Sequence, residues 1–370
     1  MKNIKLYLLV FAVAVMSTSC SEDNDHSGSG TLKLSGTVMA PNNLFPISRA
    51  HIKVSKDGNV VAEQTADALG QFTVDHLPSG NLAVELSKGK FKRQITIDLE
   101  ADYELQPLER NLDVFPNIAV VTGNYDQIEE ILMNIGVVDP DSGAPAFDIV
   151  AGTPSDGRQS DPHGGKSTVA RSAALPPNTT FNFNTLIHDS ALLAQYDIIF
   201  LNCGGKEDYA SDPVALQNLK TYIENGGIVY ATDWMFKYVR GMFDESDYLH
   251  FALPEKSGSS LSSNCEIQNS DLVTWLEGQG ITVTASITVN GFLGSWQMVD
   301  NFNTTNVTSW LVADSVTYAG ATLPGKSLAF TFQYGQGGVF YSSFHTHGND
   351  AAEAAITQMM YYFIFELSGL

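Results

Sequence analysis

The stretch Gly227 to Asp233, GIVYATD, decides the fold of this chain. It is a short, continuously apolar run with helical spacing after it in Trp234 to Met242, which predicts a strand buried on both faces and then a helix. Three further units share this pattern: Asn117–Gly123 with Tyr125–Gly136, Tyr196–Gly204 with Val214–Gly226, and Gly338–Phe344 with a final helix from about Ala351 to Leu367. Repeated units of this kind predict a doubly wound, mainly parallel sheet.

Three stretches of the same half interrupt the repeat. The segments near 153–194 and 244–270 are long insertions, which we expect to build a rim over one edge of the sheet. Residues 281–333 are expected to add further β structure.

The predicted strands bring polar residues to one place, because the carboxyl ends of parallel strands meet at the same edge of a sheet and ligands normally bind there. These residues directly follow the strands: Thr122, Gly123 and Asn124; Asn202, Cys203 and Gly204; Asp233 and Trp234; and His345 and His347. We expect this edge to be the site, with the first six residues and Trp234 as ligand contacts.

His345 and His347 are two residues apart, so they would lie on the same side if the last strand continued that far. That spacing is compatible with two ligands of a divalent metal. Asp233 could complete the ligand set or act as an acid/base partner of an imidazole. The sequence also leaves open a hydrogen-bonded structural role or direct contact with a ligand.

Two stretches of this half carry a family resemblance. Leu219 to Asp233, LKTYIENGGIVYATD, and Gly335 to His345, GQGGVFYSSFH, resemble the flavodoxin-like class I glutamine amidotransferase fold, in particular its ThuA-like branch. The resemblance implies a triad histidine at His345, followed by His347 in the place of a glutamate. It also implies a nucleophilic cysteine in the turn after residues 227–233, where this chain has Asp233. Without a thiol at that turn, no glutamyl thioester forms, so we predict no amidotransferase activity.

The apolar residues between Thr31 and Leu99 alternate with polar ones, which predicts a small antiparallel β-sandwich. Three stretches, Ser35–Val38, Asp67–Val74 (DALGQFTV) and Leu77–Val84 (LPSGNLAV), resemble the carboxypeptidase regulatory-like module, which has a transthyretin-like, Ig-like fold. Such modules are generally spacers or adhesive domains. Residues 31–100 are therefore expected to form this domain, 101–116 a linker, and 117–370 the α/β domain.

The first residues predict the location of the protein. Lys2 and Lys5, a short apolar run and the small residues before Cys20 are typical of an export signal, and the pattern resembles a bacterial lipoprotein signal. The resemblance implies cleavage after residue 19 and acylation, for example with palmitate, at Cys20. Residues 20–30 would be a flexible tether. The acidic run Ser21–Asp25 resembles a sorting tag of surface lipoproteins, so we expect an outer-membrane lipoprotein that is displayed at the cell surface.

Charge and cysteine content limit the function further. A formal net charge of −21 repels phosphate backbones, so the sequence predicts no nucleic-acid partner. Cys203 and Cys265 remain if Cys20 is acylated, and they could form a disulfide, pack as small apolar residues or include a reactive thiol.

Two functional hypotheses follow from the sequence. The first is a non-catalytic or degenerate-site protein that binds a ligand, a glycan or an envelope protein. The alternative is a metal-dependent or Asp/His-dependent hydrolase or isomerase acting on a small polar or carbohydrate-like substrate.

Overall fold

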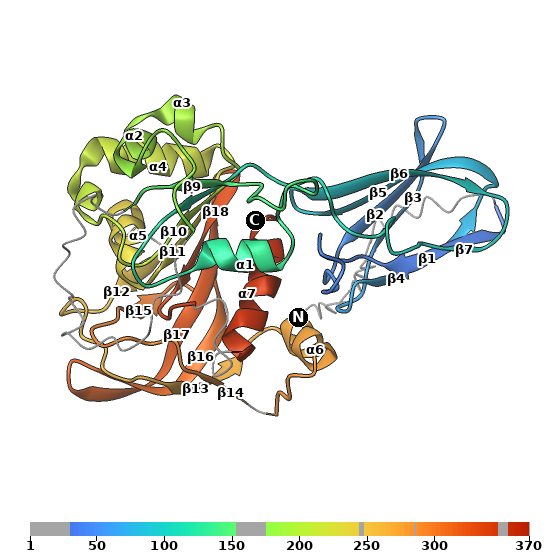
Figure 1. Ribbon diagram of the computed structural model, residues 1–370. Helices are drawn as coiled ribbons and strands as arrows, with labels where there is room; N and C mark the ends of the chain where they lie inside the picture. Colours follow the sequence, from blue (N-terminus) through green and yellow to red (C-terminus); the bar gives the residue numbers. More distant parts are fainter. Residues whose placement is uncertain (1–29, 153–174, 244–247, 285, 347–353, 370) are drawn as a thin grey trace, which may run out of the picture.

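The computed structural model describes residues 30–152, 175–243, 248–284, 286–346 and 354–369. Figure 1 shows two parts side by side, a smaller one built of strands and a larger one in which helices surround a long sheet. Cys20, His347 and most of the first predicted insertion lie outside the described residues.

The smaller part consists of two sheets. One has the strand order β4-β1-β7 and the other β3-β2-β5-β6. Their bounds are β1 Leu32–Thr37, β2 His51–Lys56, β3 Asn59–Thr65, β4 Gln71–Leu77, β5 Gly80–Lys88, β6 Phe91–Leu99 and β7 Tyr103–Glu104. Alternate residues of β4 and β5 are buried, and the buried residues of both sheets belong to one hydrophobic cluster. The alternation in the sequence therefore reflects two sheets that share a core.

The predicted linker is tied to this part of the molecule. Within residues 101–116, β7 pairs in parallel with β1, and Val114 forms a bridge with Lys92 of β6. Leu105 and Leu112 are buried in the shared cluster. The segment lacks strict alternation because it contributes only two residues to a sheet edge.

The larger part is organised around a nine-stranded sheet with the order β14-β13-β16-β17-β18-β11-β10-β8-β9. Five neighbouring strands are parallel: β8 Ile118–Val121, β9 Asp148–Val150, β10 Ile198–Leu201, β11 Ile228–Thr232 and β18 Gly337–Ser342. Numbered along the chain, their spatial order is 2-1-3-4-5, which is the flavodoxin-like order. The predicted buried strands at 117–123, 196–204, 227–233 and 338–344 all belong to this half.

The prediction of a mainly parallel sheet is wrong for the other half. The strands β13 Ser263–Ile267, β14 Ile287–Val289, β16 Val307–Tyr318 and β17 Ala321–Tyr334 extend the sheet from β18 through antiparallel pairs. β13 falls in the segment that was expected to form a rim. Strands β12 Leu249–Phe251 and β15 Val299–Phe302 form a separate pair. The long β16–β17 hairpin needs no crossover helix, so it could extend the sheet without repeating the strand–helix unit.

Helices cover both faces of the parallel half. Helices α1 Ile128–Asn134 and α7 Ala354–Leu367 pack in one hydrophobic cluster, whereas α2 Phe183–His188, α4 Pro213–Glu224 and α5 Phe236–Phe243 pack in the other. Successive residues of β11 alternate between the two clusters, since Tyr230 belongs to the first and Val229 to the second. The remaining helices are α3 Ser190–Leu193, α6 Ser270–Gly278 and the short turns η1 Asp208–Ser211 and η2 Asp233–Met235.

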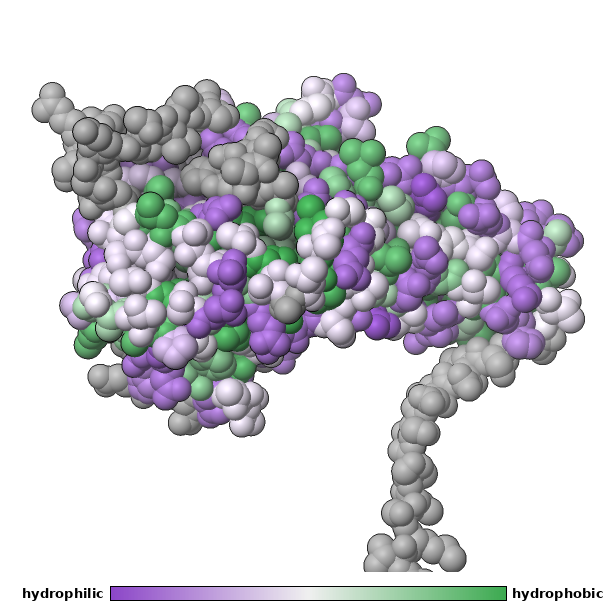
Figure 2. All heavy atoms as spheres, turned by 90° about the horizontal axis from the view of Figure 1, so that it is seen from below, coloured by the Kyte–Doolittle hydropathy of each residue, from purple (hydrophilic) through white to green (hydrophobic). Residues whose placement is uncertain are grey.

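The two parts share their core. The α1/α7 cluster continues into the buried residues of the two small sheets. At the junction, the Trp275 indole of α6 donates to the Pro46 carbonyl at 2.8 Å, and the Phe91 and Phe365 rings meet edge to face. Arg49 forms two 2.8 Å hydrogen bonds with Asp271. Figure 2 shows polar and apolar residues interspersed over the lower surface of both parts.

None of the described helices has the length and apolar character needed to cross a membrane.

Candidate functional site

The residues predicted at the sheet edge are brought together by the ends of β8, β10, β11 and β18. The Cys203 N–H, after β10, donates at 2.8 Å to Thr232 Oγ1, the last residue of β11. The Tyr125 N–H, after β8, donates to the Cys203 carbonyl at 3.1 Å. Backbone and side-chain hydrogen bonds therefore join the first three strand ends directly.

Two glycines allow this close approach. A Cβ at Gly123 would lie 2.1 Å from the Cys203 carbonyl oxygen, so only glycine fits there. Gly204 has a φ of +81° and adjoins Tyr125 and Asn124, and this left-handed conformation also favours glycine. Thr122 accepts a 3.0 Å hydrogen bond from the Gly152 N–H. These predicted ligand contacts thus shape the edge through backbone packing.

Asp233 occupies a strained turn directly after β11. Its φ is +38°, which is uncommon for a residue other than glycine and is found mainly where surrounding structure enforces it. The carboxylate is fully buried. Asp233 Oδ1 accepts a 2.7 Å hydrogen bond from the Gln297 N–H, and Oδ2 lies 3.3 Å from His345 Nε2 and 3.8 Å from Cys203 Sγ. The turn therefore directs an acidic side chain inward, toward the histidine and the thiol.

His345 is held in a fixed orientation after β18. Its N–H donates to the Gly291 carbonyl at 2.7 Å, and its Nδ1 lies 3.0 Å from the same oxygen. Because a carbonyl only accepts, Nδ1 carries a proton and Nε2 faces Asp233. Burial lowers the pKa of His345, but Cys203 first, and then Asp233 and Asp126, outweigh burial and hold that pKa well above its ordinary value. The raised pKa favours an imidazolium at His345, beside the carboxyl group of Asp233.

The thiol of Cys203 stays protonated in this arrangement. Burial, together with Asp233 and Asp126, raises the pKa of Cys203 to about 12, although His345 opposes the shift. A neutral thiol is a weak nucleophile. Cys203 and Cys265 are both free and buried, so they do not form the disulfide considered from the sequence.

Asp126 joins the strand ends and was not predicted from the sequence. Its carboxylate accepts hydrogen bonds from the Cys203 N–H at 2.7 Å, the Thr346 N–H at 2.9 Å and the Thr232 hydroxyl. The side chain is buried, and three donors satisfy its charge. The sequence signal that could have revealed Asp126 is its position shortly after the predicted strand at residues 117–123.

Glu129, on the first turn of α1, is a second buried carboxyl group that the sequence did not reveal. Burial raises the pKa of Glu129 from 4.5 to about 7, although a hydrogen bond from Asn202 opposes this shift. The Asn202 Nδ2 lies 2.9 Å from Glu129 Oε2. Asn202 Oδ1 and Glu129 Oε1 have no hydrogen-bond partner among the described residues. Asn202, predicted as a ligand contact, therefore faces this carboxyl group.

Trp234 is buried under a basic side chain. Lys256 Nζ lies 3.5 Å from the centre of the indole ring, and the indole N–H donates to the Ser295 carbonyl at 2.8 Å. Lys256 also pairs with Glu207 at 2.8 Å. Both the indole N–H and the aromatic face of Trp234 are therefore engaged within the protein.

Three groups of the cluster could hold a metal ion. One ligand atom from each of Asp126, Cys203 and His345 lies within 4.8 Å of the others, and all three residues are buried. Thiolate, imidazole and carboxylate together suit zinc, whose tetrahedral ligand atoms lie about 3.3–3.8 Å apart. The ligand atoms would have to approach one another, and Asp126 would have to share the carboxylate that already accepts three hydrogen bonds.

Comparison with known proteins gives similarities of shape at low sequence identity. A 5-hydroxyisourate hydrolase from Klebsiella pneumoniae is 20% identical, with a TM-score of 0.19, over 20% of this chain and 86% of that one. A protein of the GMP synthase type from Thermoplasma acidophilum is 11% identical, with a TM-score of 0.38, over 69% of this chain and 96% of that one. A ThuA-like protein from Parabacteroides merdae is 11% identical, with a TM-score of 0.37, over 68% and 88%. No protein-family model and no curated protein sequence matches the chain.

Fold and site together define a two-part protein whose α/β domain has a flavodoxin-like strand order and a buried Asp–His–Cys cluster at the carboxyl edge of its sheet. Membership of residues 31–100 in a transthyretin-like family, and of residues 117–370 in the ThuA-like family, stays a prediction.

Proposed function

We propose that this chain is a lipoprotein of the cell envelope whose α/β domain binds a ligand without converting it. The lipid on Cys20 would attach the chain to the outer membrane, and the two small sheets would space the α/β domain from the lipid. The ligand would be a glycan or another envelope protein, bound at the carboxyl edge of the large sheet.

The observation that carries this proposal is the state of the turn after β11. Where the amidotransferase resemblance implies a nucleophilic thiol, Asp233 is buried and already engaged by the Gln297 N–H and by His345. The nearby thiol of Cys203 is protonated at neutral pH, because its pKa is about 12. Neither group is prepared to attack a substrate, which favours binding over covalent catalysis.

Binding and turnover can be tested on the same purified full chain. We expect saturable binding to members of an oligosaccharide array and no ammonia release from L-glutamine. A folded Asp233→Asn/His345→Gln variant should bind more weakly, whereas a His188→Gln control, which alters a surface pair with Asp212, should not. Ammonia release or undiminished binding by the double variant would overturn the proposal, and absence of saturable binding would exclude a glycan as the ligand.

Anchoring is tested separately. Cells that express the full chain should incorporate radiolabelled palmitate into the protein, and the label should disappear in a Cys20→Ala variant. Protease treatment of intact cells should degrade a surface-displayed protein. Unlabelled wild-type protein, or protein that is protected in intact cells, would contradict the lipoprotein or the surface assignment respectively.

A metal-dependent hydrolase or isomerase is the second candidate, favoured by the proximity of Asp126, Cys203 and His345. In this case Asp126, His345 and Cys203 as a thiolate would hold zinc, which would supply water activation or substrate polarisation. The zinc content of the purified full chain decides between the candidates. Near-stoichiometric zinc that is lost in Cys203→Ser would support the metal enzyme, and metal-free wild type would exclude it.

A further inference from the structure

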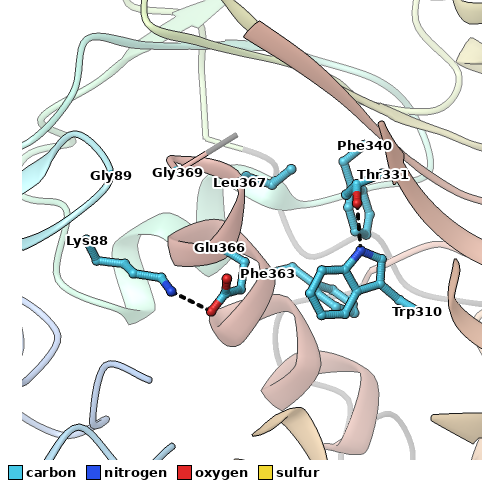
Figure 3. A pocket seen from close by; sticks show the side chains of 9 residues that line it. All are labelled: Lys88, Gly89, Trp310, Thr331, Phe340, Phe363, Glu366, Leu367 and Gly369. Atoms are coloured by element: carbon cyan, nitrogen blue, oxygen red, sulfur yellow. Dashed lines mark hydrogen bonds and ion pairs between the residues drawn. The ribbon is translucent and has the colours of Figure 1, made fainter. Parts of the chain in front are cut away.

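A cavity lies at the junction of the two parts, and none of the residues of the Asp–His–Cys cluster lines it. Its volume is about 290 Å³, close to the lower end of the roughly 300–1,000 Å³ typical of small-molecule sites. Figure 3 shows its lining: Lys88 and Gly89 from the β5–β6 hairpin; Trp310, Thr331 and Phe340 from the large sheet; and Phe363, Glu366, Leu367 and Gly369 from α7 and the residues after it. Both parts of the molecule therefore contribute to it.

Three of the nine residues that line the cavity are aromatic. Phe340 and Phe363 are fully buried, and Trp310 is only 8% exposed. The Trp310 indole N–H donates to the Thr331 hydroxyl at 3.0 Å, so its polar atom is satisfied within the wall. Protein interiors contain few voids larger than a water molecule, and an apolar void holds water poorly. An apolar group of a ligand would therefore suit this side of the cavity better than water does.

An ion pair lies at the edge of the cavity. Lys88 Nζ is 2.7 Å from Glu366 Oε1, and the two side chains are only 11% and 23% exposed. The Ser368 hydroxyl donates to the Lys88 carbonyl at 2.9 Å, which fixes the hairpin against the residues after α7. Figure 3 shows the ion pair beside Phe363. The site thus presents one positive and one negative group next to the three aromatic side chains.

We propose that this cavity binds a free aromatic amino acid. The ring would lie among Trp310, Phe340 and Phe363, the carboxylate would pair with Lys88, and the ammonium group would pair with Glu366. Lys88 and Glu366 pair with each other, so a ligand that uses both would insert between them. A zwitterion supplies a new partner to each charge, whereas a singly charged compound supplies only one. This site is separate from the edge cluster and does not depend on the function proposed for it.

The proposal is tested by calorimetric titration of the full chain with four probes: L-tryptophan, indole, indole-3-propionate and tryptamine. L-Tryptophan should bind at least about tenfold more tightly than indole, because only L-tryptophan can pair with both Lys88 and Glu366. Lys88→Met should weaken L-tryptophan and indole-3-propionate but not tryptamine. Glu366→Gln should weaken L-tryptophan and tryptamine but not indole-3-propionate.

Two further variants keep the test decisive. Leu367→Trp should fill the cavity and abolish binding of all four probes, with folding checked by circular dichroism. Lys90→Met, on the same hairpin but paired with Asp197, should leave binding unchanged. Absence of saturable L-tryptophan binding by the wild type, or binding that Leu367→Trp and Lys88→Met both retain, would overturn the proposal. Asp233→Asn should not affect L-tryptophan binding, so this test is independent of the binding proposed at the carboxyl edge of the sheet.

Discussion

At the scale of single residues, the carboxyl edge of the large sheet concentrates buried charge. Asp126, Asp233 and His345 are fully or almost fully buried. Each charge is compensated locally, by three donors around Asp126 and by the ion pair between Asp233 and His345. Removing one partner should therefore leave a buried charge uncompensated, which is strongly destabilising.

Asp233 should control the ionisation of His345. Replacing Asp233 with Asn keeps the acceptor for Gln297 but removes one of the groups that raise the pKa of His345, so that pKa should fall. A histidine NMR titration of wild type and Asp233→Asn measures this. His188, whose pKa is raised by Asp212 at the surface, provides an internal control that should not move. An unchanged His345 pKa would show that Asp233 is not its partner.

The same pair should make stability depend on pH. The pKa of His345 is higher in the folded than in the unfolded chain, so its contribution is complete below about 6.5 and is lost as the pH rises through the folded value. Urea unfolding of the wild type between pH 6 and 10 should show this loss of unfolding free energy. The His345→Gln variant has no imidazole at this position, so its stability should lack this loss over the same range.

Glu129 provides a pH-dependent prediction of its own. Its pKa is about 7 in the folded protein and near 4.5 in the unfolded chain. Between these two values, the folded state retains a proton that the unfolded state has lost. Stability should therefore fall as the pH rises from 4.5 to 7, by about 3 kcal/mol in total. Glu129→Gln should remove this loss and be more stable than wild type at pH 8. The partly exposed Glu130→Gln serves as control, and equal pH profiles for wild type and Glu129→Gln would refute the prediction.

At the scale of elements, the hairpin between β17 and β18 depends on Gly335. Its φ is +65°, and a Cβ would lie 2.4 Å from the Glu224 carbonyl at the end of α4. Gly320, in the turn between β16 and β17, has a φ of +78° but open space around it. Gly320→Ala should thus cost about 1–2 kcal/mol of unfolding free energy, from the left-handed conformation alone. Gly335→Ala should cost clearly more, about 3 kcal/mol or above.

Chemical denaturation of the two glycine variants measures the difference. Similar losses for both would show that the hairpin can move away from α4 without a penalty.

The elements also differ in how far they could be predicted from the sequence. The parallel strands could be predicted because strands buried on both faces are continuously apolar, and the edge they share followed from their direction. The contact between Asp233 and His345 was accessible in this way. Gln297 and Gly291 could not be found, because they reach the edge from irregular segments whose position depends on the antiparallel half. β9 has only three residues, too few for a periodic signal.

At the scale of the whole molecule, the two parts should unfold together, because one hydrophobic cluster extends through both. All four tryptophans, Trp234, Trp275, Trp296 and Trp310, lie in the larger part, so their fluorescence reports on that part. Phe91→Ala removes a buried ring of the smaller part that packs on Phe365, and should cost about 3–5 kcal/mol. The unfolding transition seen by tryptophan fluorescence should shift accordingly. If Phe91→Ala does not shift the midpoint of the transition seen by tryptophan fluorescence, the two parts unfold independently.

The central claim is that the edge cluster contains a charged pair between His345 and Asp233, rather than a bound metal or an activated thiol. The most direct test is the ¹⁵N–¹H correlation spectrum of the His345 ring at pH 7 in the purified full chain. We predict protons on both ring nitrogens, as in an imidazolium. A neutral ring, with Nε2 bound to a metal or free of its proton, would contradict the claim.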